Sequence, residues 1–265
     1  MITGQELVQR IEKFSPLSLK MHDDPTGLQV GGLLQPVHRV LTTLDVRPEV
    51  VQEAIELKAD FILAHHPLMF HPAKNLDISV PQNQMYADLL THQITVYAAH
   101  TNLDRAPVGM NDWLAQSLDL QNIQPFNFDE QQIALGRFGS LPKSLTIQAL
   151  AQKLKQVWQL SGVRVIAHDL ADSVRTVGII GGDGSKFYPE ALKVPLDLLI
   201  TGDVYYHTGH DLLANHLPVI DPGHHVESIF KYEMKKLLDQ WNEECPFFQL
   251  TVMASQCNTD PFTFL

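Results

Sequence analysis

Residues 38–70 read HRVLTTLDVRPEVVQEAIELKADFILAHHPLMF, and this stretch decides the fold class. HRVLTTLDV alternates with β-branched residues as a strand does, and EVVQEAIELKAD places apolar residues at helical spacing after Pro48, a residue favoured in a first helical turn. FILAHHPLMF is a short apolar run of strand type that Pro67 interrupts. A strand, a helix and a second strand in this order predict a βαβ unit, and hence an α/β fold.

The same alternation continues on both sides of this stretch. Thr3 and Glu6 form a capping-box pattern that predicts a helix over 4–14. After a helix expected over 81–92, ITVYAAHTNLD is typical of a buried strand and NDWLAQSLDL of a helix. A second round of strands and helices begins near residue 133 and ends with the long amphipathic helix of VESIFKYEMKKLLDQWNEE and a strand in FFQLTVMAS.

Two domains are expected from this rhythm. The polar stretch QNIQPFNFDEQQ, residues 121–132, is the best boundary candidate. We therefore predict a first α/β domain formed by 1–125 together with 218–265, which carries most metal ligands, and a second formed by 126–217.

Composition excludes several classes of protein. The 265 residues hold 30 acidic and 19 basic side chains, a net charge of -11 with no Lys/Arg run, which disfavours nucleic-acid binding through the bulk surface. We find neither a signal-peptide core at the N-terminus nor an apolar run that could span a membrane. Only Cys245 and Cys257 occur, outside any C-x-x-C pair, which fits a reducing compartment and predicts a cytoplasmic protein.

Thirteen histidines, mostly in clusters, make metal binding the first hypothesis. His65 and His66 end a predicted strand, where open α/β sheets usually place ligand sites. Neighbouring strand side chains point to opposite faces, so the two imidazoles more naturally serve two ions than one.

Two further segments supply possible ligands at strand ends. His100 and Asp104 follow the next predicted strand, and we favour a ligand role for Asp104 over the alternative of a helix cap or Asx-turn, because an imidazole pair needs an anionic partner. His224 and Glu227 are three residues apart at the start of a helix, where Glu227 alone could simply complement the helix dipole. His225 is an alternative to His224, and the sequence leaves that choice open.

Other polar motifs have two interpretations each. GGDGS at 181–185 matches neither standard phosphate-loop pattern, which favours a tight turn over a phosphate-binding nest beside Lys186. His207, His210 and Asp211 either support the site or lie on the surface. The remaining histidines that we single out have no ligand partner at a suitable spacing and are assigned no function: His22, His38, His92, His168 and His216.

Taken together, the motifs resemble the Nif-three-like family, whose members often carry the label GTP cyclohydrolase 1 type 2 homolog. The matching stretches follow one another through nearly the whole chain: GLQVGG (27–32), ADFILAHHPLMF (59–70), YAAHTNLD (97–104), GIIGGDGS (178–185), LLITGDVYYH (198–207) and VIDPGHHVE (219–227). Pro25 and Val108 depart from the family pattern, which usually has Asn and Gly there.

The resemblance implies two interlinked α/β/α domains with a dinuclear metal site in the cleft between them, and a ring-shaped homohexamer. Carried over by motif, the metal ligands are His65, His66, Asp104, His224 and Glu227. At 265 residues the chain is too short for the mid-chain domain of longer relatives.

The favoured function is a metal-dependent hydrolase acting on a nucleotide or another phosphorylated small molecule. Imidazole and carboxylate ligands suit two divalent ions of zinc, iron, manganese or nickel. His100 is expected to carry protons as an unbound neighbour of the ions. The alternative is a metal-binding assembly or regulatory protein without turnover, although the scarcity of cysteine favours an open, reactive site over a closed structural one.

Overall fold

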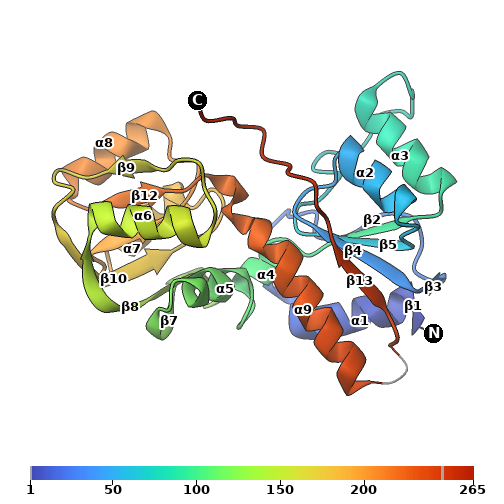
Figure 1. The fold of residues 1–265 in the computed structure, drawn as a ribbon, viewed down its shortest axis with the longest axis horizontal. Helices are drawn as coiled ribbons and strands as arrows, with labels where there is room; N and C mark the ends of the chain where they lie inside the picture. Colours follow the sequence, from blue (N-terminus) through green and yellow to red (C-terminus); the bar gives the residue numbers. More distant parts are fainter. Residues whose placement is uncertain (1, 246–247) are drawn as a thin grey trace. The chain divides into compact units, whose positions relative to one another are not determined.

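The computed structural model describes residues 2–245 and 248–265 and divides the chain into two compact units (Figure 1). Unit 1 comprises Met1–Ala106 and Phe230–Asp260, and unit 2 comprises Pro107–Ile229 and Pro261–Leu265. Each unit contains a mixed sheet with helices packed on it. The predicted two-domain α/β fold is therefore confirmed.

The sheet of unit 1 is built on the stretch 38–70. Its strands, in spatial order, are β13 (Thr251–Ala254), β4 (Arg39–Thr43), β5 (Phe61–Ala64), β6 (Thr95–Ala98) and β2 (Gly27–Val30). The first four are parallel, and β2 runs antiparallel to β6. The carboxyl ends of β4, β5 and β6 consequently meet at one edge of the sheet, which is where such sheets bind ligands.

Helices cover both faces of this sheet. α2 (Pro48–Glu56) and α3 (Pro81–Thr91) share one hydrophobic cluster with Ile62 of β5. On the other face, α1 (Gly4–Phe14) accepts a 2.8 Å hydrogen bond from Tyr97 through Glu12, and α9 (Ile229–Glu244) accepts one of 2.7 Å from Thr42. Unit 1 is therefore an α/β/α sandwich. A two-stranded pair, β1 (Ile2–Thr3) with β3 (Pro36–Val37), and the 3-10 helix η1 (Leu17–Leu19) complete it, along with α4 (Thr101–Arg105).

Unit 2 has a six-stranded sheet of different topology. In spatial order it contains β7 (Gln121–Phe128), β8 (Ala134–Thr146), β10 (Ser173–Ile179), β11 (Leu198–Ile200), β12 (Val219–Asp221) and β9 (Arg164–Ile166). Only β10, β11 and β12 are parallel. Its helical segments are α5 (Met110–Ser117), α6 (Ile147–Val157), η2 (Ser185–Phe187), α7 (Tyr188–Ala191), α8 (Tyr206–Ala214) and η3 (His224–Ser228).

The domain boundaries differ from those expected at 125/126 and 217/218. The chain leaves unit 1 after Ala106 and returns at Phe230, so unit 2 is inserted into unit 1 in the sequence. The polar stretch 121–132 is not a linker because most of it forms β7, an edge strand that pairs with β8. An edge strand with polar residues on its exposed side has the composition of a linker, which explains the error. Likewise, β12 pairs with β11 and so belongs to unit 2.

The helix predicted from the capping box is confirmed, and one predicted strand is shorter than expected. α1 begins with the predicted capping box, in which Thr3 N–H donates to Glu6 at 2.7 Å and Glu6 N–H donates to the Thr3 hydroxyl at 3.3 Å. The strand expected over ITVYAAHTNLD is shorter: β6 ends at Ala98, and residues from Thr101 form α4. Across the described residues, none of the helices has both the length and the apolar character to cross a membrane.

Candidate metal centre

The segment directly after β5 brings two adjacent imidazoles together, with ring centroids 4.9 Å apart. His65 is completely buried, and its Nδ1 lies 2.8 Å from the Ala99 carbonyl oxygen. His66 is partly exposed, and its Nδ1 lies 2.7 Å from a carboxylate oxygen of Asp45. In each ring an acceptor holds the Nδ1 proton, so that the Nε2 lone pair is available for a metal ion.

The next strand brings a third imidazole and a carboxylate to the same edge. His100 follows β6, and Asp104 lies on α4 and is almost fully buried. His65 Nε2 is 3.4 Å from Asp104 Oδ1. His65, His66 and His100 each offer a ring nitrogen within 4.8 Å of the other two. Unit 1 alone thus assembles three imidazoles and one carboxylate.

Asp24 fixes the orientation of His100. Its Oδ1 is 2.8 Å from His100 Nδ1, and its other oxygen accepts hydrogen bonds from the hydroxyls of Thr26 and Thr101. Burial would raise the pKa of this carboxyl, but hydrogen bonding to His100, its charge, and the two hydroxyls outweigh burial, so the pKa lies well below its usual range. Asp24 is therefore an anionic acceptor that leaves His100 Nε2 directed away from it.

Unit 2 contributes a second, smaller group of ligands. His224 and Glu227 lie on η3 directly after β12, and His224 Nε2 is 3.2 Å from Glu227 Oε2. His224 Nδ1 is 2.6 Å from Asp203 Oδ2, the same arrangement as in unit 1. His225 joins no group of candidate ligands among the described residues, so the geometry favours His224.

The GGDGS loop lies beside this second group of ligands, and its glycines are needed there. Gly182 has a φ of 58°, and its carbonyl accepts a hydrogen bond from Gly184, which makes the loop a tight turn. A Cβ at Gly182 would lie 2.9 Å from Glu227 Oε1 and 3.0 Å from His224 Nε2, and a Cβ at Gly181 would lie 2.8 Å from Glu227. The glycines therefore leave room for the carboxylate and imidazole beside them.

The carboxylates that orient the histidines were missed by sequence reasoning. Asp45 and Asp203 each follow a strand by a few residues, as the ligand histidines do. Their position after a strand could therefore have indicated that they lie near the ligands. Asp24 precedes β2, the antiparallel strand, and nothing in its local sequence indicates its contact with His100.

The other histidine clusters do not form comparable groups. His207 and His210 are exposed and pack edge-to-face against Tyr206, with ring centroids 5.4 and 4.9 Å from it. Asp211 is also exposed, and it is Asp203 that contacts His224.

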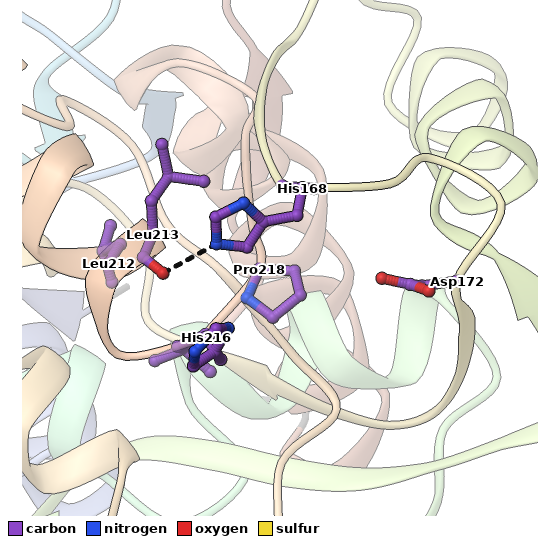
Figure 2. Close-up of a pocket in the computed structure, with 8 residues that line it drawn as sticks. His168, Asp172, Leu212, Leu213, His216 and Pro218 are labelled. Carbon is purple, nitrogen blue, oxygen red and sulfur yellow. Dashed lines mark hydrogen bonds between the residues drawn. The ribbon is translucent and has the colours of Figure 1, made fainter.

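A separate cavity of about 150 Å³ in unit 2 is lined by His168 and His216 (Figure 2). Figure 2 shows the His168 ring directed at the Leu213 carbonyl, 2.9 Å from Nε2. The two rings lie 5.3 Å apart, but no third ligand joins them among the residues that the structure describes. These two histidines, which the sequence left unassigned, form no candidate metal site.

The donor set suits a borderline divalent cation. Four imidazoles present Nε2 while an acceptor binds Nδ1, and the carboxylates of Asp104 and Glu227 lie within 3.4 Å of an imidazole nitrogen. Zinc, iron, manganese and nickel accept such mixed nitrogen and oxygen ligands, and no cysteine belongs to the set. The residues present therefore fit a metal ion.

Comparison with known proteins gives a consistent result along the whole chain. The model of the family Duf34/NIF3 (NGG1p interacting factor 3) matches residues 2–261. The chain is 40% identical over 262 residues to a GTP cyclohydrolase 1 type 2 homolog of Streptococcus pneumoniae, with 98% of each chain covered. It is 39% identical over 253 residues to the protein of that name in Lactococcus lactis, with 95% of each covered.

Solved structures agree with this assignment. A hypothetical protein of Staphylococcus aureus superposes with a TM-score of 0.94 at 28% identity, covering 100% of this chain and 99% of the other. A Bacillus cereus protein related to NIF3 gives a TM-score of 0.92 at 28% identity, with 99% of both chains covered. The resemblance seen in the motifs is confirmed, and this chain belongs to the Duf34/NIF3 family.

Proposed function

We propose that this chain is a metal-dependent hydrolase that binds two divalent ions and acts on a nucleotide or another phosphoester. His65, His66 and Asp104 of unit 1, with His224 and Glu227 of unit 2, would together hold the ions. Zinc, iron, manganese and nickel are the candidate metals. Two such ions supply Lewis acidity and a nucleophile at neutral pH.

One observation carries the proposal: each of the three ligand imidazoles has its Nδ1 hydrogen-bonded. The acceptors are the Ala99 carbonyl for His65, the Asp45 carboxylate for His66 and the Asp203 carboxylate for His224, at 2.6 to 2.8 Å. Metal-binding histidines regularly have such a partner on the ring nitrogen that does not face the ion. Two of the three acceptors are carboxylates, as in the carboxylate–histidine–metal arrangement of known metal sites.

Other roles in the proposed reaction fall to the carboxylates and to His100. Asp104 and Glu227 are almost fully buried, so solvent screens their carboxylates poorly and their attraction for a bound cation would be strong. His100 belongs to the same group of rings as His65 and His66 but follows a different strand, and we assign it the transfer of a proton to or from the substrate. Asp24, 2.8 Å from Nδ1, would hold the ring in place during this transfer.

The substrate class follows in part from the relatives. The proteins of Streptococcus pneumoniae and Lactococcus lactis are named GTP cyclohydrolase 1 type 2 homologs, so ring-opening hydrolysis of GTP belongs in the test panel beside phosphoester hydrolysis. Bound cations would offset the net charge of -11 that otherwise repels anions. We expect the reaction to take place in the cytoplasm.

Turnover of a panel of nucleotides and phosphoesters, with added manganese, zinc or iron, tests the proposal. We expect hydrolysis that Asp104→Ala abolishes, because the variant removes a buried anionic ligand. Asp172→Ala, at an exposed aspartate outside the ligand set, should keep full activity. Silence across the whole panel, with metal bound, would instead support a metal-binding assembly or regulatory protein.

A homohexamer is the assembly that we propose for this activity. Only 18% of residues are charged, which is low for a soluble domain and consistent with surface buried between subunits. Light scattering coupled to size exclusion should give about six times the chain mass of 29.8 kDa. A monomer mass would exclude the ring.

A further inference from the structure

A cavity of about 360 Å³ opens beside His66, entirely within unit 1. Its walls come from the loop between β4 and α2, from the segment that follows β5, and from α3. It therefore lies at the carboxyl edge of the parallel strands, where open α/β sheets bind their ligands. We refer to it as the Arg47 cavity.

Arg47 gives this cavity its charge. Its side chain is exposed, and its guanidinium makes no hydrogen bond or ion pair with any residue that the structure describes. The guanidinium is therefore available to an anion that enters the cavity. His71, also exposed, lines the same cavity and adds a second nitrogen donor.

Both carboxylate oxygens of Asp45, the acidic residue that lines the cavity, already accept hydrogen bonds. Asp45 uses one oxygen for His66 Nδ1 at 2.7 Å and the other for the Thr259 hydroxyl at 2.6 Å. It is not ion-paired to Arg47, although only Val46 separates the two residues. Glu49, equally close in the chain, forms no ion pair with Arg47 either, so among the described residues neither acidic neighbour neutralises the guanidinium.

The rest of the lining defines the size of ligand that the cavity accepts. Leu68 and Tyr86 are buried and make an apolar floor, and the Gln82 amide donates to the Tyr86 hydroxyl at 3.0 Å. Small-molecule sites span roughly 300 to 1,000 Å³, so this cavity suits one compact group rather than a long ligand.

We propose that the Arg47 cavity binds the phosphate of a phosphorylated small molecule, held by the Arg47 guanidinium with His71 beside it. Arginine suits this task because its planar fork can donate two parallel hydrogen bonds to a phosphate. The role of the cavity rests on the proposed function: a phosphate anchored here places the rest of the substrate next to His66. Arg47 is thus a positioning residue for the reaction, and its binding of phosphate is measurable without turnover.

Binding of inorganic phosphate, measured by isothermal titration calorimetry on the full chain, tests this proposal. The chain is titrated as purified and after removal of metal by a chelator, which separates binding at Arg47 from binding on the ions. We expect Arg47→Gln to raise the Kd of the metal-free chain at least tenfold, and Arg47→Lys to raise it less because the charge remains. Arg175→Gln, at an exposed arginine of β10, should leave the Kd unchanged.

Three results would overturn the proposal. They are the absence of phosphate binding in the metal-free chain, an equal Kd for wild type and Arg47→Gln, and binding of acetate as tight as that of phosphate. The metal content of the same samples separates this test from the proposed function. If the purified chain holds no metal but binds phosphate through Arg47, the phosphate site stands and the metal-dependent hydrolase is wrong. If the purified chain holds metal but its phosphate binding does not depend on Arg47, the phosphate site is wrong and the proposed function is unaffected.

Discussion

The two units present their candidate ligands in different ways. In unit 1, His65 ends a buried strand between two parallel neighbours, and its side chain is 0% exposed. In unit 2, His224 lies on a 3-10 segment after Gly223, whose φ is 83°, and its side chain is 38% exposed. Strand ends within a sheet are fixed by the ladder on both sides, whereas a short 3-10 segment depends on side-chain contacts. Unit 1 is therefore the preorganised part of the ligand set.

Removing ligands from each unit should give the largest difference. We expect His65→Ala/His66→Ala to reduce the metal content from about two ions per chain to almost none, and His224→Ala to remove about one. Mass spectrometry on protein purified without chelator measures both. His168→Ala/His216→Ala, a histidine pair whose rings lie 5.3 Å apart outside the ligand set, is the matched control and should retain the metal. Equal losses in the first two variants would remove the distinction between the units.

The orienting carboxylates give a smaller and more specific comparison. Asp45→Asn and Asp203→Asn keep the size of the side chain but remove the anion next to Nδ1 of His66 and His224. Loss of such a partner weakens metal affinity by about 10- to 100-fold. We expect the greater loss for Asp45, because its side chain is 27% exposed against 43% for Asp203 and is less screened by solvent.

A competition titration against a chromophoric chelator measures these affinities. Asp88→Asn on α3, at an aspartate that contacts Gln84 and no candidate ligand, is the control and should change nothing. A greater loss in Asp203→Asn would mean that unit 2, not unit 1, dominates metal binding.

The smallest effect concerns backbone strain just inside unit 2. Val108 has a φ of 60°, a conformation that β-branched residues rarely adopt. Val108→Gly should raise the free energy of unfolding by about 1 kcal/mol, because relief of strain exceeds the added entropy of the unfolded chain. The hydrogen bond from this residue's N–H to Asp112, 3.0 Å long, is kept.

Chemical denaturation measures this change. Val157→Gly, at an exposed valine in the last turn of α6, should have the opposite sign because glycine destabilises a helix. Destabilisation by both variants would show that Val108 is not strained.

Sequence reasoning found the parts of this molecule that depend on local patterns. The βαβ unit of 38–70, the capping box of α1 and the ligand types at strand ends are all properties of short segments. It failed at β7, because an edge strand and a linker have similar composition. It also missed Asp24, whose contact with His100 spans 76 residues of sequence and arises only when β2 pairs with β6.

The route of the chain through the two units has a consequence for the order of folding during synthesis. Strand β13 pairs with β4, yet the two are separated by all of unit 2. Unit 2 is nearly complete when Ile229 leaves the ribosome, whereas the sheet of unit 1 still lacks its last strand. The nascent chain must therefore hold an unfinished sheet, with β4 as an open edge, for more than a hundred residues of translation. The exposed edge of β4 is the point at which a stalled or truncated chain would aggregate.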